Sequence, residues 1–204
     1  CIVGGLFAAN ALAGNIADKD ELAQMAAQLE GHPDNSNPAI FGSMVVGAQN
    51  KNSMNHVRLE LPDDLIFATM VPDFPVSTAD ARRVLPDSYT RGDMVFNASR
   101  AALLVASMMT GKYENFDMAM EDCVHQPYRA QLIPGMNEIF KHAKEFGAVA
   151  SYLSGAGSTL MAMVTKDKAE EFERKMSEYL GTLEHNWELK LLKADMQGVL
   201  VETE

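Results

Sequence analysis

The spacing of apolar residues divides the chain into helices and strands. An amphipathic helix is predicted over 19–29, because apolar residues recur there at helical intervals. These residues are Leu22, Met25, Ala26 and Leu29. Asp18 is suited to cap this helix at its start, and Gly31 and Pro33 are suited to end it. Similar spacing predicts further helices over 2–16, 77–85, 93–109, 114–123, 135–146 and 168–183. We expect 2–16 to be packed and 93–109, closed by Gly111, to be buried.

Strands are predicted where β-branched and other apolar residues cluster between turn signals. The predicted strands are 40–46, 57–61, 65–71, 149–153, 159–164, 187–192 and 199–202, with a polar turn over 49–55. The order of elements is mixed rather than a regular alternation of strand and helix, so the fold class is α+β. We expect a domain join near residue 60.

Two late helices have well-defined apolar faces. In 135–146 the residues expected to face the core are Met136, Ile139, Phe140 and Ala143. In 168–183 they are Phe172, Met176, Tyr179, Leu180 and Leu183. Both patterns are typical of helices that cover one face of a sheet.

Composition limits the class of partner. The 204 residues are 47% hydrophobic and 22% charged, as expected for a globular protein with a packed core. The formal net charge of −11 argues against a nucleic-acid partner. No apolar run approaches the roughly 20 residues that cross a bilayer, so we expect no membrane partner. Cys1 and Cys123 are too few for a disulfide framework, and we expect reduced thiols and a cytoplasmic location.

The chain begins within an apolar stretch and without a methionine. A natural N-terminus rarely begins inside a predicted helix, so we expect this chain to be a fragment.

The first candidate site is the turn Glu30-Gly31-His32-Pro33-Asp34-Asn35, which follows the predicted helix 19–29. A carboxylate pair of this kind can hold Mg²⁺ or orient a hydroxyl group. Gly, Pro, Asp and Asn are also the residues that ordinary turns use. On spacing alone, the ordinary turn is the favoured interpretation.

The second candidate is Ser154-Gly155-Ala156-Gly157, between two predicted strands. Small residues allow close approach of the backbone, and successive N–H groups can face a phosphate. Taken alone, a tight β-turn is the favoured interpretation of this segment.

Arginines supply the third group of candidates. Thr78 and Arg82 stand at i and i+4 and share a helix face, and Arg129 follows the turn at Pro127. The guanidinium fork suits carboxylates and phosphates, although a lone arginine is usually a surface residue. Asn97 lies in the apolar helix 93–109 and needs a partner, which is either substrate or a loop of the protein.

The order of these motifs along the chain resembles the homoserine kinases of the GHMP family of small-molecule kinases. The matching segments are Ile2–Leu6 with Ala8–Asn10, Glu30–Asn35, Val71–Phe74 with Ser77–Arg82, Phe96–Leu103, His125–Arg129, Leu132–Gly135 and Ser154–Thr159. The Glu30–Asn35 and His125–Arg129 motifs are specific to homoserine kinases, whereas the glycine turn is shared by GHMP kinases in general. The chain departs from the family at Ser36-Asn37, Ser43 and Ser158.

The resemblance implies a fold and a reaction. It implies a GHMP kinase fold, with residues 1–60 a remnant of the ATP-binding N-terminal domain and 61–204 a ferredoxin-like C-terminal domain. The implied reaction transfers the γ-phosphate of ATP to the hydroxyl of L-homoserine, giving O-phospho-L-homoserine in threonine biosynthesis. ATP and Mg²⁺ are the implied cofactors, and a homodimer is the implied assembly. The family's phosphate loop is expected before Cys1, so the fragment alone should bind ATP poorly.

Residue roles follow from the same resemblance. Asp34, Asn35 and His32 are expected to contact homoserine, and Arg82 and Arg129 to bind its α-carboxylate. Asp34 and Thr78 are expected at the reacting hydroxyl. The segment Ser154, Gly155, Ala156 and Gly157 is expected at the ATP phosphates, and Glu30 at Mg²⁺.

Two alternatives remain open. One is another GHMP kinase, acting on mevalonate or a sugar. The other is a ligand-binding module without catalytic activity, because the phosphate loop is missing from this sequence.

Overall fold

The computed structural model describes residues 1–50 and 53–202. The predicted polar turn over 49–55 falls partly on residues 51 and 52, which lie outside the described residues. The chain divides into two compact units, Cys1–Leu61 with Ala194–Glu204, and Pro62–Lys193. Each is described by itself below. Along the described parts of the chain, no helix combines the length and apolarity that a membrane crossing requires.

The first unit consists of helices and one β-hairpin. Its helices are α1 (Ile2–Leu12), α2 (Lys19–Glu30) and α3 (Ser36–Phe41), and its strands are β1 (Met44–Gln49) and β2 (Met54–Leu59). The two strands are antiparallel, with Met44 opposite Leu59 and Gln49 opposite Met54. Its core is formed by small alanines of α2 and by Ile40 of α3, with apolar residues of α1 packed against them.

The ends of α2 confirm the predicted capping chemistry. The Asp18 side chain accepts a hydrogen bond from the backbone N–H of Glu21, and the Glu21 carboxylate accepts one from the backbone of Asp18. Gly31 ends the helix in the left-handed region with φ 84°. This conformation strains any residue with a Cβ, which explains glycine at that position.

Several predictions for the first unit were wrong. The helix predicted over 2–16 ends at Leu12, because Gly14 and Asn15 adopt positive φ, and none of its residues is fully buried. The predicted strand 40–46 is helical at Ile40 and Phe41 and begins only at Met44. On α2, Met25 and Leu29 are exposed, since the helix packs through its alanines. The buried residues there are Leu22, Ala23, Ala26 and Ala27.

The second unit contains an antiparallel four-stranded sheet in the order β4-β5-β3-β6. Its strands are β3 (Leu65–Pro72), β4 (Ala150–Leu153), β5 (Leu160–Thr165) and β6 (Trp187–Leu192). Along the chain, β3 is followed by helices, then by β4 and β5, and then by another helix before β6. This is the ferredoxin-like arrangement, so the predicted α+β class is confirmed.

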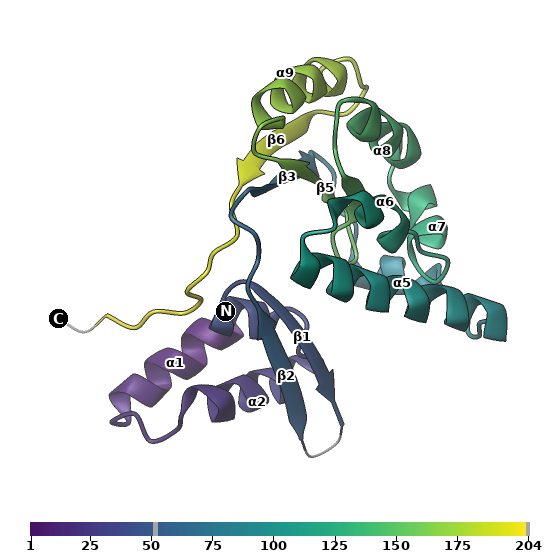
Figure 1. Ribbon diagram of the computed structural model, residues 1–204. Helices are drawn as coiled ribbons and strands as arrows, with labels where there is room; N and C mark the ends of the chain where they lie inside the picture. Colours follow the sequence, from purple (N-terminus) through teal and green to yellow (C-terminus); the bar gives the residue numbers. More distant parts are fainter. Residues whose placement is uncertain (51–52, 203–204) are drawn as a thin grey trace. The chain divides into compact units, whose positions relative to one another are not determined.

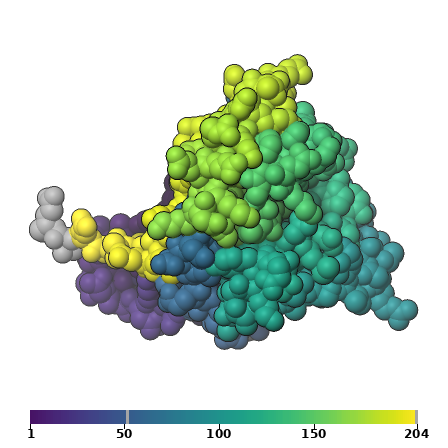
Figure 2. Space-filling model, turned by 45° about the horizontal axis from the view of Figure 1, so that its top comes forward, coloured from purple at the N-terminus to yellow at the C-terminus, as the bar shows by residue number. Residues whose placement is uncertain are grey.

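Two helices cover one face of this sheet, as Figure 1 shows. They are α8 (Met136–Glu145) and α9 (Ala169–Leu180). Their predicted inner faces are confirmed: Met136, Ile139 and Ala143 are buried on α8, and Phe172, Met176 and Leu180 on α9. The half-buried Phe140, Tyr179 and Leu183 pack against the same core. Figure 2 shows the outer surface of this unit, with α8 in green and α9 in yellow-green.

The remaining helices of the second unit are α4 (Thr78–Arg83), α5 (Arg91–Thr110), α6 (Phe116–Ala119) and α7 (Gln126–Arg129), with short 3₁₀ turns at Tyr113–Asn115 and Ala130–Leu132. The long helix α5 starts earlier than predicted, because Thr90 and Asp93 form a capping box. Gly111 ends it, as predicted.

Three predictions for the later chain were wrong. Helix α5 is not buried along its length, since Met94, Val95 and Met109 are exposed. The helix predicted over 114–123 ends at Ala119, and a loop follows. Residues 199–202, all of them described, contain no strand. Of these described residues, only Val199 makes a backbone hydrogen bond to another segment, from its N–H to the carbonyl of Ile40.

Candidate functional site

The turn after α2 brings the first group of predicted residues together in the first unit. The His32 imidazole Nδ1 contacts the Asp34 carboxylate, and both side chains are accessible to solvent. Asn35 is exposed at the start of α3, where its side chain makes no capping hydrogen bond. The turn therefore holds an imidazole, a carboxylate and an amide close together in the sequence, on side chains that remain accessible to solvent.

Glu30 directly precedes Gly31, one of the residues that line a hollow in the same unit. The hollow has a volume of about 490 Å³ and is lined by Gly31, His32, Pro33, Gly47, Gln49 and Asn50. The Glu30 oxygen Oε2 is buried, and no described residue donates a hydrogen bond to it. A buried carboxylate oxygen without a donor is costly, so this atom is suited to a cation or a ligand.

Helix α4 carries the predicted Thr78 and Arg82 in the second unit. The Ser77 side chain begins the helix by accepting a hydrogen bond from the backbone N–H of Asp80. Arg83 pairs with the Asp80 carboxylate at 2.8 Å. Among the described residues, the guanidinium of Arg82 has neither a carboxylate nor a carbonyl partner, and it is exposed. Arg82 is therefore available to bind an anion.

Arg129 connects α4 to the glycine turn. Its Nε donates to the carbonyl of Ala81 at 3.1 Å, and its Nη1 donates to the carbonyl of Gly155 at 2.9 Å. Ala81 is the residue before Arg82. Within the second unit, Arg129 thus links α4 to the glycine turn through these two carbonyls, and a shared carboxylate site at Arg82 and Arg129 stays a prediction.

A buried carboxylate, Asp122, holds the loop before α7. Burial by itself would raise the pKa of Asp122, but hydrogen bonds outweigh it and lower the pKa below its usual value. The donors are the side-chain amide of Asn97 at 2.6 Å and the backbone N–H groups of Val124, His125 and Gln126 at 3.2, 2.8 and 2.5 Å. The sequence left the role of Asn97 open; the structure shows that its side chain bonds to Asp122 and so attaches this loop to α5.

His125 is a neutral neighbour of Arg129. Burial lowers the pKa of His125, and the Arg129 charge lowers it further, against the opposing effect of Asp122. A neutral imidazole can accept a hydrogen bond, and its Nδ1 lies 3.4 Å from Nη1 of Arg129. His125 therefore helps to hold the arginine in place.

The glycine turn follows β4. Gly155 and Gly157 have φ values of 54° and 91°, and a Cβ at Gly157 would lie 2.9 Å from Cδ1 of Ile133. The N–H of Gly157 donates to the carbonyl of Ser154. No described residue accepts a hydrogen bond from the N–H groups of Gly155 and Ala156. Two adjacent free N–H groups can bind an anion such as a phosphate.

The predicted site residues thus form two groups. Glu30, His32, Asp34 and Asn35 belong to the first unit, and Thr78, Arg82, Arg129 and the segment 154–157 to the second. That the two groups converge on one substrate stays a prediction. Sequence reasoning missed Asp122, although the amide of Asn97 on an apolar helix was a signal that such a partner exists.

Comparison with known proteins identifies the family. A family model described as "GHMP kinases C terminal" matches residues 100–182. A homoserine kinase of Clostridium novyi is 46% identical over 198 residues, which cover 97% of this chain and 66% of that protein. A homoserine kinase of Clostridium kluyveri is 40% identical over 201 residues, covering 98% of this chain and 67% of that protein. The chain belongs to the homoserine kinase family.

Solved structures agree with this family. The crystal structure of homoserine kinase from Cytophaga hutchinsonii has a TM-score of 0.87 at 26% identity, over 96% of this chain and 64% of that one. A putative homoserine kinase from Listeria monocytogenes has a TM-score of 0.79 at 30% identity, over 99% of this chain and 67% of that one. The chain spans about two thirds of the length of these homoserine kinases and of the curated relatives above.

More distant GHMP proteins share the fold alone. A mevalonate kinase from L. major has a TM-score of 0.68 at only 13% identity. The homoserine kinase family is thus distinguished from the wider fold by sequence identity.

Proposed function

We propose that this chain is the larger part of a homoserine kinase, which transfers the γ-phosphate of ATP to the side-chain hydroxyl of L-homoserine. The single observation that carries the proposal is the identity of 40–46% to homoserine kinases over nearly the whole chain. The arrangement around Arg129 supports it, because an arginine held beside the free backbone N–H groups of the glycine turn suits a substrate with a carboxylate and a phosphate donor.

In this proposal Arg82 and Arg129 bind the α-carboxylate of homoserine. Arg82 has no partner among the described residues, and Arg129 is fixed by the carbonyls of Ala81 and Gly155. A fixed guanidinium loses little conformational entropy on binding, which favours a preorganised carboxylate site.

The turn after α2 supplies the other end of the substrate site. Asp34 orients the homoserine hydroxyl, with His32 in contact with its carboxylate and Asn35 beside it. In this proposal Thr78 also contacts the reacting hydroxyl. Phosphoryl transfer depends mainly on positioning and on neutralising charge, so Asp34 need not remove the proton before the transition state.

The proposal includes ATP and Mg²⁺ as cofactors. Mg²⁺ typically takes one or two carboxylates of the protein and oxygens of the substrate phosphates. The buried Oε2 of Glu30 fits that requirement, because it has no donor among the described residues. When bound, Mg²⁺ neutralises charge on the phosphates. Ser154, Gly155, Ala156 and Gly157 face the ATP phosphates in this proposal, through the free N–H groups of Gly155 and Ala156.

A cytoplasmic location and a homodimer complete the proposal. Cys1 and Cys123 are free thiols, which suits a reducing compartment. The homodimer rests on the family resemblance alone.

The test is a coupled assay of ADP release with the full product of the gene that encodes this chain. L-homoserine, mevalonate and galactose are compared as acceptors. We expect turnover with homoserine only, because the relatives that are 40–46% identical are homoserine kinases and because galactose offers no carboxylate to the arginines. Preferred turnover of mevalonate or galactose would overturn the proposal.

The same assay tests the role of Asp34 with the variant Asp34→Asn. If Asp34 is an essential base, the variant should lower kcat by about 10²–10⁴-fold. Near-full turnover of the variant would limit the role of Asp34 to orienting the hydroxyl.

A further inference from the structure

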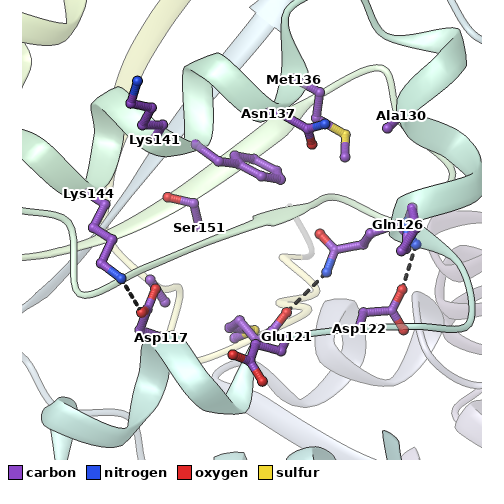
Figure 3. Close-up of a pocket in the computed structure, with 14 residues that line it drawn as sticks. Asp117, Glu121, Asp122, Gln126, Ala130, Met136, Asn137, Lys141, Lys144 and Ser151 are labelled. Atoms are coloured by element: carbon purple, nitrogen blue, oxygen red, sulfur yellow. Dashed lines mark hydrogen bonds and ion pairs between the residues drawn. The ribbon is translucent and has the colours of Figure 1, made fainter. Parts of the chain in front are cut away.

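A second pocket lies in the second unit, apart from the residues assigned above. It has a volume of about 600 Å³ and lies between α6, α7, α8 and the edge strand β4. Figure 3 shows it close up, with its lining residues as sticks. Neither the arginines Arg82 and Arg129 nor the segment 154–157 lines it.

Positively and negatively charged side chains line different walls of this pocket. Lys141 and Lys144 lie on the α8 wall, and Asp117, Glu121 and Asp122 lie on the opposite wall, with Ser151 of β4 between them. Lys144 and Asp117 already pair with each other at 2.6 Å, so the remaining positive charge is that of Lys141 on one wall and the remaining negative charge is on the other wall, within one small-molecule-sized hollow. A ligand with two opposite charges matches it better than a simple anion or cation.

Each wall retains unused binding capacity. On the acidic wall, Asp117 uses Oδ2 for Lys144 at 2.6 Å, and Glu121 uses Oε2 for Arg100 at 2.8 Å. No described residue donates to Oδ1 of Asp117 or to Oε1 of Glu121. These two oxygens are therefore free to accept from an ammonium group.

The basic wall is free to bind a carboxylate. The Nζ of Lys141 lies 3.8 Å from Glu138, a loose contact, and no described residue bonds the side-chain amide of Asn137. The Ser151 hydroxyl is buried and has no partner in the described chain. A buried hydroxyl without a partner is a second, independent sign of a missing polar ligand.

Apolar side chains complete the lining. Met120, Met136 and Phe140 contribute to it, so a ligand with an apolar side group is favoured over a wholly polar one. A metal ion is not favoured, because the described residues contain no group of three or more ligating side chains that could hold one. Addition of a peptide strand to β4 is opposed by Gln126, whose Oε1 already accepts the N–H of Leu153 at 2.8 Å.

We propose that this pocket binds a small zwitterion with an apolar side group, the chemistry of a free apolar α-amino acid. Its carboxylate lies at Lys141, Asn137 and the Ser151 hydroxyl, and its ammonium group at Asp117 and Glu121. Gln126 belongs to both regions: it lines the pocket and starts α7, which also carries Arg129. An occupant of the pocket thus contacts the helix that positions the candidate carboxylate site.

The test is a calorimetric titration of the full product of the gene that encodes this chain, without ATP or homoserine, so that it does not depend on the proposed kinase activity. L-Leucine is compared with 4-methylpentanoate, which lacks the amine, and with 3-methylbutan-1-amine, which lacks the carboxylate. We expect leucine to bind more tightly than both. If leucine and either analogue bind equally well, the pocket does not recognise a zwitterion. If leucine does not bind at all, the proposed binding site is wrong.

Variants locate the binding. Ser151→Ala and Lys141→Met each remove one partner of the carboxylate and should weaken leucine binding by about tenfold. The control is Lys175→Met on α9, which removes a lysine outside the pocket together with its ion pair to Glu171 at 2.7 Å and should leave the affinity unchanged. Circular dichroism checks that each variant is folded. Binding that persists unchanged in both pocket variants would contradict the assignment.

Discussion

At the scale of single residues, the structure explains how Arg129 is held. The arginine is fixed by two backbone carbonyls, and its neighbour His125 is fixed through the loop that Asp122 organises. Asp122 is nearly inaccessible to solvent, with a side chain that is 6% exposed. Its oxygens accept hydrogen bonds from Asn97 of α5 and from backbone N–H groups of the loop, so this carboxylate connects the loop to α5.

His125 gives a prediction about pH. Burial lowers the pKa of His125 below the usual value of 6.5. The folded state therefore binds fewer protons than the unfolded state in this range. The stability that neutral His125 contributes is fully present above pH 6.5 and is lost as the pH falls from there through the folded-state pKa. His125→Gln should flatten this dependence, measured as the free energy of unfolding in urea between pH 5 and about 7.5.

The control is His185→Gln, at a histidine in partial contact with solvent. This variant should retain the wild-type fall in stability below pH 6.5. An unchanged pH dependence in His125→Gln would show that His125 is not the titrating group.

At the scale of elements, helices were predicted more accurately than strands. Local capping chemistry set the ends of α2 at Asp18 and Gly31, and the sequence shows these residues directly. The strands predicted over 40–46 and 199–202 failed because a strand needs a partner, which local sequence does not reveal. Residues 40 and 41 form a helix because Ile40 is buried against α2.

The glycine turn gives a prediction about backbone conformation. Gly157 has a φ of 91° and no room for a Cβ, whereas Gly155 has a φ of 54° and open space around it. Gly157→Ala should therefore lower the free energy of unfolding by roughly 2–4 kcal/mol, through strain and the clash with Ile133. Gly155→Ala, the matched control, should cost about 1 kcal/mol. Equal losses in urea unfolding would contradict this account of the turn.

At the scale of the whole molecule, the order of motifs was more informative than any single motif. The glycine turn, the arginines and the turn after α2 each had an ordinary explanation, and only their order indicated the family. The structure shows that Arg129 bonds to the carbonyls of Ala81 in α4 and of Gly155 in the glycine turn, all within the second unit. The Asp122 hydrogen bonds could not be predicted, because they join a helix to a loop 25 residues later in the chain.

The central claim is that Arg82 and Arg129 recognise the α-carboxylate of homoserine. Arg82→Gln tests it best, because the neighbouring Arg83, paired with Asp80, offers a matched Arg83→Gln control. The acceptors are L-homoserine and 3-aminopropan-1-ol, which is homoserine without its carboxylate.

The measurement is kcat/KM for both acceptors in the full gene product and in each variant. The account predicts that Arg82→Gln lowers kcat/KM for homoserine by roughly 10- to 100-fold and leaves that for 3-aminopropan-1-ol unchanged, while Arg83→Gln alters neither. An equal loss for both acceptors, or no loss for homoserine, would contradict carboxylate recognition by Arg82.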